Sequence, residues 1–552
     1  MVRLAAAAVL LATAGALLAR DTPRAALPRD VLVSDDRSGE TYARVDGTSD
    51  AVTDACGHGR QPQNEPSVAV DPSDPRVIAV GANEWCPVPS LGMGWQGYYR
   101  STDGGDSWSR FLLPGYRGDT LGSGPSGAKP CRDLSDPALA FDGTGRLYFA
   151  ILCPEGRGRG RDLVTSVRVV IMDDHGSRYT GTSMVRASST EVFVDKPAIA
   201  VDTTGGPHDG AVYVAYNLIR PPSDRPVCPS VTVEVAASTD RGATFHPASI
   251  EGPVCQQVEG DIAVGPGGSV DVVFRAGDGI FVARSMDGGA SFQEAVRAAS
   301  MEGFTSYHFS GGGSRLCGDG PFECSSGQTF ARFSDIPTIV EDEGGIHVAF
   351  SALRDDRQGK VFVLGSSDGV RWSEPAQVDQ EPAGHQWFPD IASNLGVLLL
   401  AFYDSRADPG FLPVRAPGNG LGGVSSGPSV DVYLARSADG GQTWGETRLT
   451  EVSSNPNYEV VGQGRAPFFG DYISVGSGGD TTFVAWTDSR DVVPGDDPRE
   501  TDAADDRDGF DVYLPCVFEP PDIDAKRYRR PSPDDPCLSQ GGLDLNIYGG
   551  RG

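Results

Sequence analysis

The stretch SADGGQTW, residues 437–444, directly follows the strand-like sequence DVYLAR and recurs along the chain. It places a serine, an aspartate, two glycines and an aromatic residue within eight positions. The shared pattern is S-x-D-x-G-x-x-[W/F]. Copies begin at Ser101, Ser238, Ser285 and Ser437, with a copy one residue shorter at Ser366 and a degraded copy at Met172. A unit that returns at intervals of tens of residues is typical of solenoids and propellers.

The chemistry of this motif is that of a tight turn between two strands. Its aspartate can accept hydrogen bonds from nearby backbone N–H groups, and its glycine supplies the positive φ that the turn needs. A phosphate-binding loop would instead need a lysine after the glycines and a helix behind them, and the sequence has neither. We therefore predict that the motif is structural and that its aromatic residue anchors the next strand in the core.

A second repeat precedes each of these turns. Its first strand reads EPSVAVD, DPALAFD, KPAIAVD, GDIAVG, IPTIVED, FPDIAS and GDYISV in successive copies. The copies have a mean spacing of about 67 residues, and all but the last carry the turn motif. The last copy has FDVYLP at 510–515, which we interpret as its third strand, while VLVSDD at 31–36 supplies a missing outer strand and closes the ring.

These repeats predict an all-β protein, a β-propeller with seven blades, six blades being the alternative. Each blade is expected to be a four-stranded antiparallel sheet with the turn motif between its third and fourth strands. The predicted divisions are a signal peptide at 1–19, an N-terminal segment at 20–59, the propeller at 60–518 and a Pro-rich polar tail at 519–552.

The N-terminus predicts a secreted, extracellular protein. Arg3 is followed by an apolar run that ends in small residues, which is typical of a secretory signal, with cleavage after Ala16 or Ala19. The run is too short for a membrane anchor. The ten cysteines indicate disulfides. One connectivity, pairing between sequence neighbours, would give 56–86, 131–153, 228–255, 317–324 and 516–537.

The net charge of −29 argues against nucleic acid and anionic membranes as partners. We expect a monomer without a cofactor. The acidic segment 491–509 has no EF-hand spacing, so we interpret it as a solvated loop, with a Ca²⁺ site as the less favoured alternative.

The repeated turn is similar to the BNR/Asp-box repeats of the sialidase (neuraminidase) superfamily, over nearly everything from 60 to 515. The resemblance implies a glycoside hydrolase of the exo-sialidase type that acts on acidic glycans at the top face of the propeller. The alternative is a non-catalytic module that binds glycan or protein there, because many non-enzymes share the box. Sialidases have six blades, whereas seven repeats are counted here.

Sialidases hold the substrate carboxylate with three arginines, use a tyrosine nucleophile activated by a glutamate, and use an aspartate as acid/base. The resemblance of GDYISV and of EGDIAVGPGGSVDVVFR to family stretches implies Tyr472 as nucleophile, Glu259 as its base and Arg275 as one arginine. Asp136 is the acid/base candidate. Candidates for a further arginine in late loops are Arg357, Arg406 and Arg490.

The position of the first family arginine differs in this chain. Asn64 and Glu65 stand where the family has Phe-Arg-Ile-Pro. Losing one charge-assisted bidentate contact would cost roughly 1.5–3 kcal/mol of carboxylate binding, and Glu65 adds repulsion. Asn64 therefore argues against a sialidase, whereas Tyr472, Glu259 and Arg275 argue for one.

Every repeat also offers a carboxylate near the start of its first strand. The set comprises Glu65, Asp136, Asp195, Glu259 with Asp261, Asp335, Asp390 and Asp471. In a propeller these positions meet around the axis at the top face. We predict a ring of carboxylates there, either as a ligand or hard-cation site or, residue by residue, as turn caps and ion pairs between blades.

Overall fold

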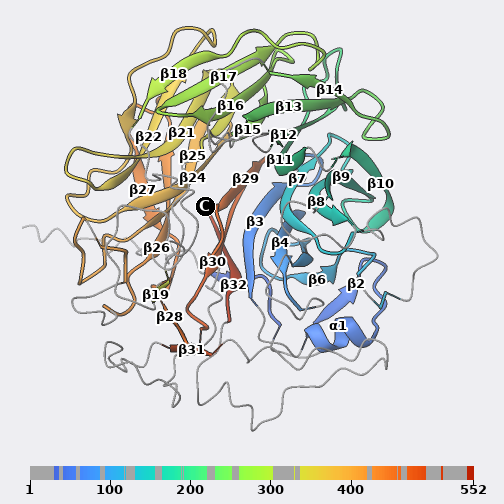
Figure 1. The fold of residues 1–552 in the computed structure, drawn as a ribbon, viewed down its shortest axis with the longest axis horizontal. Coiled ribbons are helices and arrows are strands. Elements are labelled where there is room, and N and C mark those ends of the chain that lie inside the picture. The colour runs from blue at the N-terminus through green and yellow to red at the C-terminus, as the bar shows by residue number, and fades with distance from the viewer. Residues whose placement is uncertain are drawn as a thin grey trace, which may run out of the picture.

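The structure is a computed structural model, and its described residues form a ring of seven sheets (Figure 1). The described residues are 30–36, 41–57, 62–86, 94–116, 118–119, 131–155, 164–187, 189, 192–220, 230–250, 260–301, 328–329, 336–413, 415–418, 426–456, 458–461, 469–492, 511–513 and 544–552. The predicted seven-bladed β-propeller is confirmed.

The first three blades follow the chain from the inner to the outer strand. Blade 1 contains β3 (Gln63–Val70), β4 (Ile78–Glu84), β5 (Trp95–Ser101) and β6 (Ser109–Leu112). Blade 2 contains β7 (Ser135–Phe141), β8 (Leu147–Glu155), β9 (Val164–Asp173) and β10 (Arg178–Ala187). Blade 3 contains β11 (Phe193–Val201), β12 (Val212–Arg220), β13 (Ser230–Ser238) and β14 (His246–Ser249).

The next three blades have the same order. Blade 4 contains β15 (Gly260–Val264), β16 (Val270–Ala276), β17 (Gly279–Ser285) and β18 (Val296–Ser300). Blade 5 contains β20 (Thr338–Asp342), β21 (Gly345–Leu353), β22 (Gly359–Ser366) and β23 (Ala376–Gln377). Blade 6 contains β24 (Gln386–Asn394), β25 (Val397–Asp404), β26 (Asp431–Ser437) and β27 (Gly445–Arg448).

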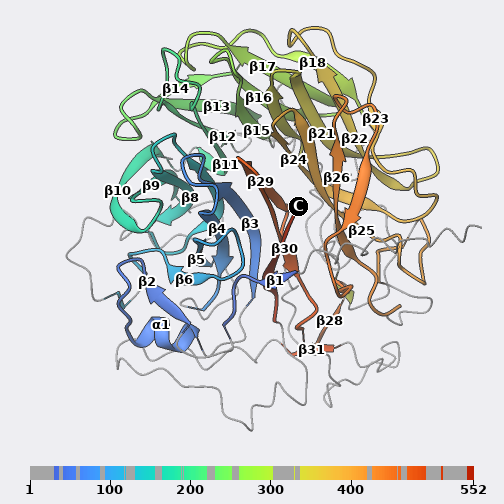
Figure 2. The ribbon, with the colours of Figure 1, turned by 180° about the vertical axis from the view of Figure 1, so that it is seen from behind.

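Blade 7 closes the ring with strands from both ends of the chain (Figures 1 and 2). It contains β29 (Ser474–Gly478), β30 (Thr481–Asp488), β32 (Asn546–Arg551) and β1 (Val31–Leu32). The predicted closure by the N-terminal segment is confirmed, since Val31 pairs with Gly549 and Leu32 with Tyr548. Closure of the ring leaves only short, protected strand edges.

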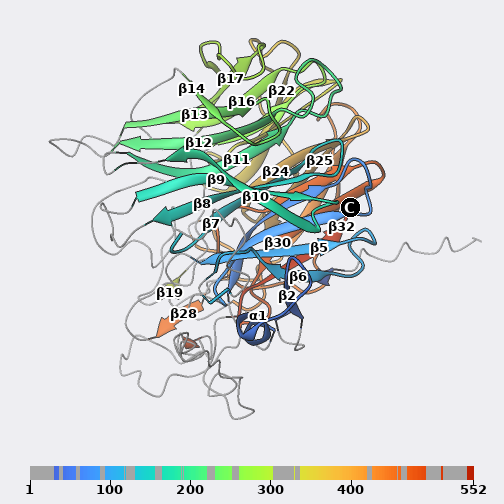
Figure 3. The same cartoon turned by 90° about the vertical axis from the view of Figure 1, so that its right-hand side faces the viewer.

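The third strand of this blade corrects the prediction, because residues 546–551 replace residues 510–515. β32 pairs with β30 along its whole length and buries Ile547 in the core. The expected third strand contributes β31 (Asp511–Tyr513), which pairs in parallel with β28 (Tyr458–Val461). The end of the predicted tail therefore belongs to the propeller. Together with β19 (Gln328–Thr329), β28 and β31 make a small sheet beside the ring (Figure 3).

The N-terminal segment also extends blade 1 on its outer side. β2 (Tyr42–Arg44) pairs in parallel with β6, and α1 (Ala51–Cys56) follows it. Two of the predicted disulfides, Cys56–Cys86 and Cys131–Cys153, are formed. The other six cysteines lie outside the described residues, as does the predicted signal peptide.

The repeated motif lies between the third and fourth strands of the first six blades. In blade 6, Ser437 Oγ accepts a hydrogen bond from Gly441 N at 2.8 Å and donates one to Asp439 Oδ1 at 2.7 Å. Asp439 Oδ1 also accepts a hydrogen bond from Thr443 N at 2.9 Å. Gly441 has a φ of 87°, and Trp444 is half-buried against the core. The motif therefore acts as a turn here.

Neighbouring inner strands are joined by side chains at one repeated position. Ser67, Asp261, Asp390 and Ser474 each accept a hydrogen bond from a backbone N–H of the next blade. For example, Val475 N donates to Asp390 Oδ2 at 2.7 Å. We call these four residues the inter-blade clamps. They fix the inner ends of the blades and so the width of the axial channel.

Candidate functional site at the mouth of the axial channel

A cavity of about 250 Å³ lies on the axis and is lined by inner-strand residues from all seven blades. The residues two positions before the clamp position include Glu65, Asp136, Lys196 and Tyr472. Asp136, Lys196 and Tyr472 line the cavity. We call these four residues, with Asp195 and Asp471, the mouth cluster.

Local backbone geometry re-aims several of these side chains. Glu65, Asp136 and Lys196 have φ values of 56°, 55° and 47°, each directly before a proline. The pairing of each inner strand with its second strand shifts register there. Such bulges redirect a side chain out of the regular alternation of a strand. At the X-Pro sequences of blades 1, 2 and 3, the strand entry therefore departs from regular strand geometry.

An ion pair connects blade 3 with blade 7 within the mouth cluster. Lys196 Nζ lies 2.5 Å from Asp471 Oδ2, and the two side chains are 13 % and 1 % exposed. The same ammonium lies 5.6 Å from the centre of the Tyr472 ring. Lys196 and Asp471 therefore hold the two sides of the mouth together beside the phenol.

Tyr472 is half-buried, and its pKa is raised well above the ordinary value of a tyrosine. Burial in the channel is the main cause, and the carboxylates of Glu65, Asp136 and Asp195 add to it. The phenol is therefore neutral at ordinary pH and has three carboxylates within electrostatic reach. Gly470, with a φ of 109°, lets the chain pass close to Glu65, because a Cβ at this position would lie 2.9 Å from Glu65 Cγ.

Asn83 in β4 organises the blade 1 side of the mouth. Its Nδ2 donates to Glu65 Oε2 at 2.7 Å and to Asn64 Oδ1 at 3.0 Å. Its Oδ1 accepts from Asp136 N at 3.2 Å. Asn64 is 0 % exposed. It therefore supports Asn83 from within the blade, and its buried position gives a substrate no access.

The candidate arginines do not line the cavity within the described part of the chain. Arg406 Nη2 lies 2.6 Å from Asp404 Oδ2, Arg406 Nη1 lies 2.8 Å from Glu446 Oε2, and the guanidinium is 4.0 Å from the centre of the Tyr433 ring. These contacts bind Arg406 within its own blade.

The other candidate arginines also lie away from the cavity lining, in contacts or turns of their own blades. Arg490 pairs with Asp488 at 2.7 Å and with Asp30 at 2.8 Å, over the ring of Tyr548. Arg275 Nε donates to the oxygen of Gly277 in the β16–β17 turn at 3.1 Å. Arg357 is exposed in the turn between β21 and β22. Glu259 lies outside the described residues.

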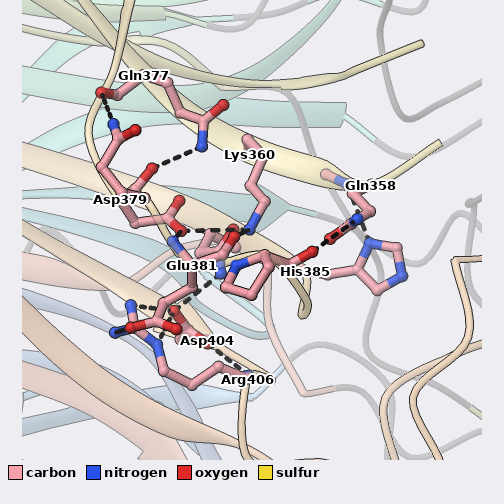
Figure 4. A network of polar contacts seen from close by, with 12 residues as sticks. Gln358, Lys360, Gln377, Asp379, Glu381, His385, Asp404 and Arg406 are labelled. Carbon is pink, nitrogen blue, oxygen red and sulfur yellow. Dashed lines mark hydrogen bonds and ion pairs between the residues drawn. The ribbon is translucent and has the colours of Figure 1, made fainter. Parts of the chain in front are cut away.

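A second buried polar network lies beside Arg406, between blades 5 and 6 (Figure 4). Lys360 Nζ is buried and donates to Asp379 Oδ1 at 3.2 Å and to the oxygen of Glu381 at 3.1 Å. The pKa of His385 is lowered to about 3, first by burial and then by the charge of Lys360. His385 Nδ1 accepts from Gly359 N at 3.0 Å. A neutral, buried histidine of this kind holds the loop in place and has no exchangeable charge near pH 7.

The clamp carboxyls Asp261 and Asp390 line the same cavity as Tyr472. Burial raises the pKa of Asp261 to about 6. Burial, followed by the charge of Asp261, raises the pKa of Asp390 to about 8. Members of the predicted carboxylate ring therefore differ in role. Asp261 and Asp390 join neighbouring blades. Glu65, Asp136 and Asp195 raise the pKa of Tyr472 through their charge.

Lys196 was not among the site residues predicted from the sequence. The available signal was that KPAIAVD places a lysine where the first two repeats place an acid. Within the described residues there is no group of three or more His, Cys, Asp or Glu side chains that could hold a metal ion. Nor does the described chain contain a helix of the length and apolarity needed to cross a membrane.

No protein-family model matches the chain, and no curated protein is similar to it in sequence. Among solved structures, the chain is similar to the intramolecular trans-sialidase of Ruminococcus gnavus, with 14 % identity, a TM-score of 0.40, and coverage of 62 % of this chain and 89 % of that one. It is similar to the leech intramolecular trans-sialidase, with 12 % identity, a TM-score of 0.41, and coverage of 64 % and 66 %.

A Hadza microbial sialidase is similar over 74 % of this chain and 73 % of its own, with 15 % identity and a TM-score of 0.39. All three structures have TM-scores below 0.5 and identities of 15 % or less to this chain. At such identities and TM-scores they carry no argument about catalysis, which rests on the residues of the mouth cluster.

Proposed function

We propose that the protein is a secreted glycoside hydrolase whose active site is the mouth of the axial channel. The observation that carries the proposal is that Tyr472 and Asp136, from blades 7 and 2, line one cavity. Tyr472 is the nucleophile, Asp136 the acid/base and Glu65 the carboxylate that receives the phenol proton. Glu65 has the largest effect on the phenol pKa among the neighbouring charges.

The proposed reaction has two steps. Tyr472 attacks the anomeric carbon while its proton passes to Glu65, and Asp136 protonates the leaving oxygen. Water, deprotonated by Asp136, then displaces the tyrosine from the sugar, and Glu65 returns its proton to the phenolate. A tyrosine nucleophile is a known exception to the usual pair of carboxylates in glycosidases. The raised pKa of Tyr472 keeps the phenol neutral until a sugar is bound.

The size of the cavity supports action on one terminal sugar. The cavity of about 250 Å³ is slightly smaller than the roughly 300–1,000 Å³ of typical small-molecule sites. The two disulfides support an oxidising, extracellular location. We therefore expect the protein to act as a monomer on the terminal sugar of an extracellular glycan.

Turnover of a panel of aryl glycosides tests the proposal. Tyr472→Phe and Asp136→Asn should each lower kcat at least 100-fold, with unchanged folding by circular dichroism. Tyr179→Phe is the matched control, because the Tyr179 hydroxyl pairs with Thr182 in blade 2 away from the cavity. A protein that binds glycans at the mouth but hydrolyses none would be the non-catalytic module instead.

A further inference from the structure

We infer that the sugar taken at the mouth of the channel carries no carboxylate, so that the substrate is an uncharged glycoside and not a sialoside. This inference rests on the proposed function and replaces the acidic glycan that the family resemblance implies. Three features of the mouth cluster support it.

The first feature is the balance of charge around the phenol. Glu65, Asp136 and Asp195 each raise the pKa of Tyr472 through their charge. A negative sugar placed against Tyr472 would be repelled by the charges of Glu65 and Asp195, and by that of Asp136 when this residue is ionised. The channel continues inward to Asp261 and Asp390, which add no positive charge.

The second feature is the pairing of Lys196. It is the single lysine or arginine among the described residues that line the cavity. Its ammonium already contacts Asp471 at 2.5 Å, and that carboxylate is 1 % exposed. A substrate carboxylate would have to compete with this buried carboxylate for the ammonium. Lys196 therefore neutralises Asp471 and is not available as an anion anchor.

The third feature is the location of the arginines. Arg406 and Arg490 are held by carboxylates and by aromatic rings of their own blades. Asn64, at the position of the first family arginine, is buried and bonded to Asn83. The described residues thus assemble no cluster of guanidinium groups at the cavity.

Sugar hydroxyls suit this site where a carboxylate does not. Hydroxyl groups donate hydrogen bonds, and the half-buried Asp136 that lines the cavity is an acceptor when ionised. The Tyr472 hydroxyl can donate to or accept from a ring substituent. An uncharged ring therefore gains charge-assisted hydrogen bonds at the mouth without repulsion.

The test measures hydrolysis and binding together. 4-Nitrophenyl glycosides of galactose, glucose, mannose, arabinose and N-acetylglucosamine are compared with the aryl glycoside of N-acetylneuraminic acid, from pH 4 to 8. We expect kcat/KM for at least one uncharged glycoside to exceed that for the sialoside at least 100-fold. Saturation-transfer NMR with the same compounds should give the same order of binding.

A charge variant separates this account from a merely structural role of the site. Asp136→Asn removes one negative charge, so the Kd of the sialoside relative to that of the uncharged glycoside should fall several-fold. Tyr179→Phe should leave this ratio unchanged.

Preference for the sialoside would overturn the inference and leave the hydrolase standing. Binding of an uncharged glycoside without hydrolysis would support the inference and overturn the hydrolase. Absence of both binding and hydrolysis across the panel would overturn both.

Discussion

Lys196 in the third blade and Asp471 in the seventh form an ion pair with Nζ and Oδ2 2.5 Å apart, beside the ring of Tyr472. The two residues lie 275 positions apart in the sequence. Their contact ties together inner strands that are not neighbours in the ring. It links the blade 3 and blade 7 sides of the channel entrance directly.

Removing one member of this pair should destabilise the fold. Lys196→Met removes the cation that is paired with the buried carboxylate of Asp471, and breaking a buried pair on one side costs about 3–5 kcal/mol. Urea unfolding followed by tryptophan fluorescence measures the change in the free energy of unfolding. The double variant Lys196→Met with Asp471→Asn should recover most of this loss, because it removes both charges of the pair. A single variant as stable as wild type would show that the pair does not hold the mouth.

The sequence predicted those parts of the fold that repeat. The boxes and the seven strand-entry segments predicted the propeller, because their local chemistry is the same in every copy. The closure by VLVSDD was predicted because the last copy lacked an outer strand. The third strand of the closing blade could not be found this way. NIYGGR lies far along the chain from β30 and contains two adjacent glycines, so neither spacing nor alternation marks it as a strand.

The position of some mouth residues could be predicted from the sequence, whereas their role stays a prediction. Glu65 and Asp136 were expected at the mouth because each lies near the start of an inner strand, and Tyr472 because GDYISV resembles a family stretch. The positions of Arg406 and Arg490 could not be predicted, because these residues lie in loops whose course does not follow from the repeat. The pairing of Lys196 with Asp471 depends on which blades face each other across the axis, which is a property of the closed ring.

The clamp carboxyls should make stability depend on pH. Asp390 has a folded pKa of about 8, above the roughly 3.9 of an unfolded aspartate. The folded state therefore binds a proton that the unfolded state releases, and this contribution is fully present below about pH 4 and is lost as the pH rises through about 8. The slope from this group is at most about 1.4 kcal/mol per pH unit.

Asp390→Asn isolates this effect, because the amide oxygen can still accept from Val475 N but does not titrate. Urea unfolding at a series of pH values should give a flatter profile for the variant than for wild type between pH 5 and 8. Equal slopes for the two proteins would contradict the role of Asp390.

The turn motif should affect stability without affecting the site. Ser437→Ala removes the acceptor of the buried Gly441 N–H, which should cost about 1–3 kcal/mol. Turnover per folded molecule should not change, since Ser437 lies outside the cavity lining. Gln442→Ala, on the exposed side of the same turn, is the control and should stay within about 0.5 kcal/mol. Loss of turnover in well-folded Ser437→Ala would show that the turn motif takes part in catalysis.

Placing an arginine at position 64 should not create sialidase activity. Asn64→Arg puts a long charged side chain into a fully buried position next to Asn83, so we expect a large loss of thermal stability and no gain of sialoside turnover. Leu395→Arg, at a position that is 88 % exposed, controls for the added charge. A stable Asn64→Arg protein with new sialidase activity would show that the mouth of the channel can bind a substrate carboxylate.

Covalent trapping of the glycosyl-enzyme intermediate identifies the nucleophile. The protein is incubated with the 2-deoxy-2-fluoro glycosyl fluoride of the sugar that wild type prefers, digested, and mapped by mass spectrometry. We expect one added sugar on the peptide that contains Tyr472, absent in Tyr472→Phe and retained in Tyr179→Phe. An adduct on a carboxylate such as Asp136 or Glu65, or no adduct at all, would contradict it.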